Sequence, residues 1–145
     1  MPDSGENAFP LPQPSRYTQP FWDACQREEL EVSACLDCHQ LFLPAGPVCP
    51  QCWSSNMSAM TVSGAGEVFT FTVYRHSYHP ALKTPYVVAL VQLVEGPRLI
   101  SNIVGCAPEK VKIGMRVQVQ FEKEGEFVVP RFIPRERNER ENYHA

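Results

Sequence analysis

The sequence predicts a mainly β protein with an N-terminal helical segment, a cysteine-rich ribbon and a C-terminal barrel of five strands. Two Cys-x-x-Cys pairs lie in a segment with few aliphatic residues, and five β-rich runs follow it. The chain has 145 residues, of which 43% are hydrophobic and 20% charged, as in a folded protein with a core to bury. This length suits one ordinary domain or two very small ones, and it excludes a large enzyme core.

Residues 1–30 are predicted to form an extended arm followed by a short helix. The arm is rich in proline, which removes backbone donors and disfavours helix. The helix is expected to begin near Pro20, because a missing N–H costs nothing in a first turn. Phe21, Trp22 and Cys25 fall on one face of it. A Phe–Trp pair buries a large apolar area, so this face is expected to pack on the domain or on a partner.

Residues 31–60 are predicted to form a zinc ribbon. Two Cys-x-x-Cys pairs, Cys35 with Cys38 and Cys49 with Cys52, are separated by ten residues. Each short spacing lets a turn place both sulfurs on one side, so two turns supply four soft ligands in the tetrahedral geometry that zinc accepts. Metal binding would contribute on the order of 10 kcal/mol of folding free energy that this segment's small core does not supply. Four thiolates leave no position open for water, so the zinc is expected to be structural.

Other interpretations of the cysteines stay open from sequence. Iron in a rubredoxin-like site competes with zinc, because similar spacing serves both metals. Two disulfides or a redox pair are less favoured, since a single reactive pair needs no second copy and no thioredoxin-like context is present. His39 could in principle replace one thiolate. Cys106 lies outside the pairs and is expected to be a small buried residue, because no base can be placed beside it.

Residues 61–134 are predicted to form five strands, in which β-branched and aromatic residues alternate or run continuously. Phe69, Phe71 and Val73 are expected to face inward in the first of them. Three strands, a helical turn at 107–111 and two further strands follow the order of a five-stranded OB-fold barrel. A small sandwich or an SH3-like barrel fits this order less well. The expected strands are residues 66–75, 86–94, 98–104, 115–123 and 126–132.

The long loop between the first two strands of this barrel carries Arg75, His76, His79 and Lys83. In an OB fold this loop flanks the usual ligand face, and such a mixture of side chains can contact a phosphorylated ligand or a partner protein. Long loops also collect such residues by default, so a solvated loop is the alternative.

Charge and targeting signals exclude other classes of protein. The net charge is −3, and residues 1–60 hold two basic against seven acidic residues, unlike a strongly basic nucleic-acid binder. The N-terminus lacks the features of a signal peptide and no run approaches the length of a membrane helix, so a cytoplasmic protein is expected. Residues 135–145 balance three Arg with three Glu and are expected to form a solvated charged tail.

Several motifs together resemble the domain-of-unknown-function-35 family over about residues 18–134. The resemblance implies an N-terminal helical segment, a rubredoxin-like zinc ribbon and a C-terminal OB fold. Members of this family accompany thiolase-like enzymes, including those of acetyl-transfer and isoprenoid pathways and lipid-transfer-protein-like aldolases that shorten steroid side chains. Some are fused or bound to MaoC-like hydratases. The motifs are Pro20–Ala24, the two cysteine pairs, Val62–Val68, His79-Pro80, Pro85–Ala89, Glu95–Arg98 and Ile113–Met115.

The implied function is that of a non-catalytic accessory subunit in a hetero-oligomer. It would stabilise a thiolase-like or aldolase partner and help to bind or channel acyl-CoA in lipid or steroid side-chain degradation, while the catalytic residues belong to the partner. A single-stranded nucleic-acid binder is disfavoured by the acidic charge and by the inward Phe69 and Phe71. A rubredoxin-like electron carrier would require iron. The expected contacts for the partner or the CoA phosphates are Phe21, Trp22, Arg75, His76, His79 and Lys83.

Overall fold

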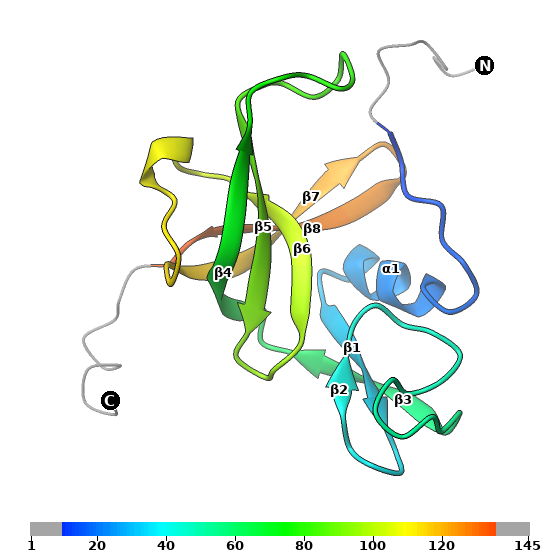
Figure 1. The fold of residues 1–145 in the computed structure, drawn as a ribbon. Helices are drawn as coiled ribbons and strands as arrows, with labels where there is room; N and C mark the ends of the chain where they lie inside the picture. The colour runs from blue at the N-terminus through cyan, green and yellow to red at the C-terminus, as the bar shows by residue number, and fades with distance from the viewer. Residues whose placement is uncertain (1–9, 136–145) are drawn as a thin grey trace, which may run out of the picture.

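The computed structural model describes residues 10–135 and shows a small three-stranded sheet beside a five-stranded barrel (Figure 1). Two predictions, the start of the arm at residues 1–9 and the charged tail at residues 136–145, lie outside the described residues. Within the described part of the chain, no helix has the length and apolar character needed to cross a membrane.

Helix α1 (Gln19–Gln26) is short and begins with a proline in its first turn, as predicted. Ala24 and Cys25 on its inner face are completely buried. The Phe21 and Trp22 rings meet edge to face at 5.1 Å, and Trp22 also contacts Phe127 of the barrel at 5.9 Å. The helix therefore packs on the barrel through an aromatic cluster, as predicted, although the Phe21 and Trp22 rings are only half-buried.

The cysteine-rich segment is built on an antiparallel sheet in the order β2-β1-β3. Its strands are β1 (Leu30–Cys35), β2 (Leu41–Phe42) and β3 (Met57–Val62). The sequence pattern does not predict these strands, because β3 is exposed over most of its length and β2 has only two residues. Pairing between β1 and β3 over their whole length places the two cysteine-bearing turns at one end of the sheet.

The barrel has the strand order predicted for an OB fold, closed as β4-β5-β6-β8-β7 with β7 returning to β4. A 3₁₀ turn, η1 (Pro108–Lys110), links its third and fourth strands. The β5–β6 and β7–β8 hairpins are antiparallel, whereas β6 and β8 are parallel and pair at a single position, Ile103 with Phe132. The strands are β4 (Ala65–Tyr74), β5 (Tyr86–Leu93), β6 (Arg98–Ile103), β7 (Arg116–Glu124) and β8 (Phe127–Pro134).

One apolar core extends from the barrel into the base of the ribbon. Phe132 and Val117 lie at its centre with no exposed surface. Leu30, Val32 and Val62 of the ribbon strands belong to the same cluster as the barrel residues. The two β units are therefore joined by shared burial as well as by the chain.

The prediction that Phe69 faces the core is wrong. The register between β4 and β5 shifts between Val68 and Thr70, so Phe69 is the extra residue of a bulge. Phe69 is 44% exposed, with the Arg98 guanidinium 3.9 Å above its ring. Phe71 and Val73 do pack against the core, as predicted. A bulge reverses the inside–outside alternation, and the alternating pattern of a single strand does not reveal it.

Candidate metal centre and apolar groove

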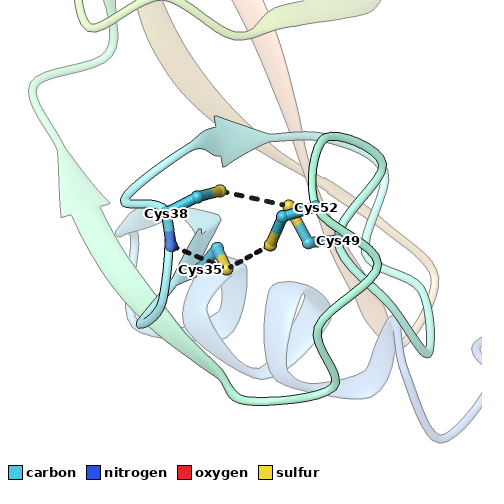
Figure 2. Close-up of side chains that lie close together, drawn as sticks. All are labelled: Cys35, Cys38, Cys49 and Cys52. Carbon is cyan, nitrogen blue, oxygen red and sulfur yellow. Dashed lines mark hydrogen bonds between the residues drawn. The ribbon is translucent and has the colours of Figure 1, made fainter.

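Four cysteines from two turns converge at the tip of the ribbon (Figure 2). Cys35 ends β1 and Cys38 lies in the turn after it, while Cys49 and Cys52 lie in the loop between β2 and β3. All four sulfur atoms lie within 4.8 Å of one another. The first cysteine of each pair is buried and the second is exposed, so the cluster sits at the surface with one side protected.

Backbone N–H groups point at the buried sulfurs. The N–H of Cys38 donates to Cys35 Sγ at 3.4 Å, and the N–H of Gln51 donates to Cys49 Sγ at 3.3 Å. The Cys38 N–H is the main cause that lowers the pKa of the Cys35 thiol to about 6. The donor to Cys35 thus favours its thiolate, which is the form that binds metal, whereas burial and hydrogen bonding to neighbouring cysteine sulfurs raise the pKa of the Cys38 and Cys52 thiols.

The two turns have the same backbone conformation. His39 follows the first pair and Trp53 the second, and both have positive φ angles, 65° and 68°. The His39 N–H donates to the Cys35 carbonyl, and the Trp53 N–H donates to the Cys49 carbonyl, each at 2.9 Å. Sequence reasoning missed this constraint, because neither position carries the glycine that left-handed backbone usually selects.

Hydrogen bonds tie the two turns together. The Leu36 N–H donates to the Asn56 carbonyl at 2.9 Å. The Asp37 carboxylate accepts hydrogen bonds from the Ser54 hydroxyl and, at 3.4 Å, from the Asn56 side-chain amide. The relative position of the two cysteine pairs is thus fixed by contacts outside the sulfur cluster.

The cluster has the dimensions of a tetrahedral metal site. The Cys35–Cys52 and Cys38–Cys49 sulfurs are 3.5 and 3.6 Å apart, whereas a disulfide bond is about 2.05 Å long. A metal held at about 2.3 Å by four sulfurs in a tetrahedron separates them by about 3.8 Å. The donor set therefore fits a divalent metal, and the disulfide interpretation does not match the distances. His39 is not part of the cluster found in the described residues.

The remaining cysteines lie elsewhere. Cys25 is fully buried in α1, and burial, aided by Glu31, raises the pKa of its thiol to about 12. Cys106 is half-buried and packs against the barrel core, where it acts as a small apolar side chain. A high pKa keeps Cys25 protonated and unreactive at neutral pH.

Most of the predicted contact residues in the loop between β4 and β5 are exposed to solvent. Arg75, His76 and Lys83 are exposed, and His79 is half-buried with its Nδ1 accepting a hydrogen bond from the Ala81 N–H at 3.1 Å. The loop projects from the end of the barrel away from the ribbon (Figure 1). It does not meet Phe21 and Trp22, so the structure does not bring the six predicted contact residues into one site.

Phe21 and Trp22 instead line an apolar groove of about 800 Å³ that the sequence did not predict. The groove lies between the arm, α1, the ribbon segment 43–45 and the outer side of β6 and β8. It follows the stretch where β6 and β8 are not paired. The groove could not be predicted from the sequence, because it joins residues 10–22, residues 43–45, residues 90–102 and residues 129–131, which are far apart along the chain.

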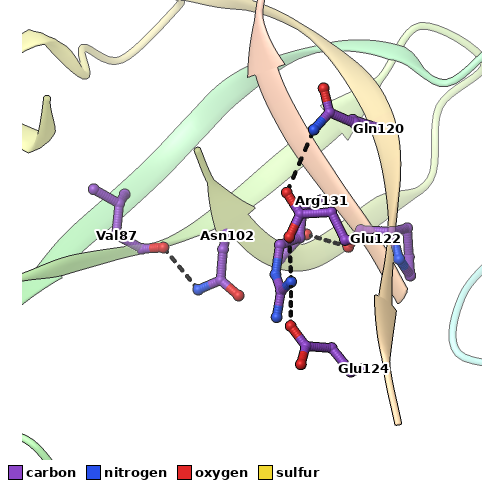
Figure 3. Close-up of polar contacts among 8 residues, drawn as sticks. Val87, Asn102, Gln120, Glu122, Glu124 and Arg131 are labelled. Carbon is purple, nitrogen blue, oxygen red and sulfur yellow. Dashed lines mark hydrogen bonds and ion pairs between the residues drawn. The ribbon is translucent and has the colours of Figure 1, made fainter. Parts of the chain in front are cut away.

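Most polar side chains around this groove are already occupied (Figure 3). Arg131 is only 11% exposed and forms ion pairs with Glu122 and, at 2.7 Å, with Glu124. The Asn102 side-chain amide donates to the Val87 carbonyl at 2.9 Å. Arg98 at the edge of the groove is exposed and lies over Phe69. The groove is therefore an apolar site with a solvent-exposed cation at its rim.

Comparisons with known proteins match both β units. The model of the ChsH2 rubredoxin-like zinc ribbon domain matches residues 22–58, and that of the ChsH2 C-terminal OB-fold domain matches residues 59–122. A "DUF35 domain-containing scaffold protein" of Pyrococcus furiosus is 37% identical over 79% of this chain and 82% of its own length.

Two relatives are named as hydratase subunits. A "probable enoyl-CoA hydratase alpha subunit" of Thermomonospora curvata is 42% identical over 79% of this chain. A "3-oxo-4,17-pregnadiene-20-carboxyl-CoA hydratase alpha subunit" of Mycobacterium tuberculosis is 34% identical over 82% of it. The chain spans little more than a third of the length of either relative, 36% and 38%.

A solved structure extends the match to three dimensions. A chain of the "Ltp2-ChsH2(DUF35) aldolase" superposes with a TM-score of 0.80 and 38% identity, covering 86% of this chain and 98% of that one. The two family models together cover residues 22–122, and the chain belongs to the DUF35 family.

Proposed function

We propose that this chain is a non-catalytic accessory subunit of a thiolase-superfamily enzyme, an aldolase or a thiolase, that acts on acyl-CoA thioesters. The observation that carries the proposal is the match to nearly the whole DUF35 chain of a solved aldolase whose name pairs two components, Ltp2 and ChsH2. The two hydratase alpha subunits support a MaoC-like hydratase as a further partner. One of their names includes a steroid acyl-CoA, which supports steroid side-chain degradation as the pathway.

The four cysteines are proposed to hold a structural zinc ion. The donor set of Cys35, Cys38, Cys49 and Cys52 is complete without water, so the ion has no open position for a substrate. The family model that matches this segment is a zinc ribbon. Reduced thiols held for a metal suit a reducing compartment, which supports a cytoplasmic location.

The apolar groove is proposed to hold the acyl part of the thioester. Its volume of about 800 Å³ lies in the range of small-molecule sites, and its lining is apolar with few polar groups. Arg98, which lines the groove and donates one hydrogen bond to the Gln92 side chain, is proposed to meet an anionic group of the same ligand. This assignment replaces the loop residues Arg75, His76, His79 and Lys83 as the first candidates for the acyl-CoA contact.

A single-stranded nucleic-acid binder is the weaker alternative. The expectation that Phe69 faces inward no longer counts against it, since Phe69 is exposed and lies beside the Arg98 guanidinium. The acidic charge of the chain still opposes binding to phosphates, and Arg98 covers the face of the Phe69 ring on which a base would stack.

Affinity purification of the full-length chain from its native host tests the proposal, with mass spectrometry and metal analysis of the same sample. The expected result is a thiolase-superfamily protein at comparable abundance, with about one zinc ion per chain. Recovery of a hydratase alone would show that the partner is a hydratase and not a thiolase-superfamily enzyme. A red protein that contains iron would contradict the proposed structural zinc. Recovery of nucleic acid, or of no protein partner, would overturn the accessory-subunit function.

A further inference from the structure

Trp53 is the most exposed large apolar side chain of the described residues, at 79%. It lies directly after Cys52, at the tip of the ribbon. Its φ angle of 68° is one that a bulky side chain rarely adopts, and the cluster imposes it through the hydrogen bond from the Trp53 N–H to the Cys49 carbonyl. A glycine would satisfy this backbone without strain. Neither the fold nor the metal cluster explains a tryptophan here.

Two other apolar side chains next to the cysteines are also exposed. Leu36 follows Cys35 and is 51% exposed, and Val48 precedes Cys49 and is 41% exposed. The Asp37–Ser54 hydrogen bond holds the two cysteine turns against each other. The two cysteine turns therefore hold exposed apolar side chains on a fixed backbone, and one of these side chains is an aromatic ring, a type of residue that often dominates binding energy at protein interfaces.

The charge of the ribbon restricts what can bind this tip. Residues 36–56, which contain the two cysteine turns, hold one acidic residue, Asp37, and no Lys or Arg. The other acidic residues of the ribbon, Glu28, Glu29 and Glu31, lie at its opposite end, where Arg27 pairs with two of them. Four thiolates around a divalent ion add a net charge of about −2. A nucleic-acid backbone or an anionic membrane would be repelled, whereas a basic protein surface would be attracted.

We infer that the ribbon tip is the anchor that docks this subunit on its partner, with Trp53 inserted in an apolar pocket that has a basic rim. The inference rests on the proposed function, since it specifies where the partner binds. It assigns docking to the ribbon tip and leaves the apolar groove free for the ligand.

The test uses the complex isolated from the host and four versions of the full chain: wild type, Trp53→Gly, Trp53→Phe and His39→Gly. Trp53→Gly is expected to weaken the affinity for the purified partner at least tenfold, on the order of an interface hot spot. It should keep the metal and should not lower the thermal unfolding midpoint, because glycine suits the backbone. Trp53→Phe should retain most of the affinity. His39→Gly makes the same backbone change in the other turn and should bind as wild type.

Two measurements on the wild-type complex complete the test. Oxidative labelling should modify Trp53 readily in the free chain and poorly in the complex, and added salt should weaken the association. If a thiolase-like partner binds while Trp53 stays fully labelled and Trp53→Gly binds as wild type, the inference is overturned and the proposed function stands. If phosphatidylglycerol vesicles protect Trp53 and the protein partner does not, the anchor is a membrane contact and the inference is wrong. If the wild-type chain has no protein partner, the proposed function and the inference both fail.

Discussion

The ribbon and the barrel solve the same problem of stability by different means. The barrel buries a continuous set of aliphatic side chains around Phe132 and Val117. Beyond its base, the ribbon has a core of only Cys35, Phe42 and Cys49, with Met57 packed against them. Two of these three buried residues, Cys35 and Cys49, belong to the proposed metal site. The comparison teaches that the barrel is stabilised by apolar packing, whereas the ribbon has little packing of its own and would depend on the proposed metal ion.

Loss of one cysteine of the cluster should have the largest effect on stability, and it should destabilise the ribbon and not the barrel. Cys35→Ser is expected to release the metal and with it most of the approximately 10 kcal/mol that a structural site contributes. Amide hydrogen exchange should then become fast in β1, β2 and β3 while the centre of the barrel stays protected. Cys106→Ser, outside the cluster, should retain the metal. Unchanged metal content and protection in Cys35→Ser would falsify a structural site.

Truncation of a core side chain of the barrel should destabilise the barrel. Phe132→Ala is expected to lower the free energy of unfolding by about 3–5 kcal/mol, because Phe132 is fully buried and its loss leaves a cavity. Urea titration followed by circular dichroism measures the change. Ile100→Ala is the control, since Ile100 is 72% exposed and should change the stability by less than about 0.5 kcal/mol. An equal decrease in the free energy of unfolding in both variants would contradict the position of Phe132 in the core.

The junction of the two units can be tested with a pair of glycines. Gly64 has a φ angle of 78°, and an added Cβ would lie 2.2 Å from Val119 Cγ1 in the barrel. Gly64→Ala should therefore cost about 3 kcal/mol, at the upper end of overpacking effects. Gly46, in the ribbon loop, has no atom within 4 Å of such a Cβ, so Gly46→Ala should be close to neutral. Thermal unfolding of both variants measures the difference, and a neutral Gly64→Ala would contradict the close approach.

The smallest predicted effect is a pH dependence from Cys25, between the two units. Its pKa is raised from 9.0 to about 12, mainly by burial. Between these values the folded chain keeps a proton that the unfolded chain loses, so the free energy of unfolding falls as pH rises, by up to about 1.4 kcal/mol per pH unit. Urea titrations from pH 8 to about 10.5 should show a steeper fall for wild type than for Cys25→Ala. Parallel slopes would contradict the prediction.

The sequence predicted the metal cluster and the barrel order because both are local patterns. Two short cysteine spacings define the ligand set, and the β-rich runs with a helical turn before the fourth define the OB order. The position of Phe69 was predicted wrongly, since a bulge depends on pairing with β5 and not on β4 alone. The apolar groove was missed for the same reason, because it joins distant segments. The positive φ of Trp53 belongs to a local turn, and it was missed because this position does not carry the glycine that such a backbone usually selects.

The shared core links the base of the ribbon to the stability of the barrel. Leu30, Val32 and Val62 belong to the ribbon strands and yet complete the core of the barrel. A chain that has not acquired its metal would hold these side chains less firmly and would open locally at the barrel's end. Proteases and chaperones act on such openings. If the chain is the metal-binding accessory subunit proposed above, limited metal supply would then reduce the number of chains that survive to bind a partner.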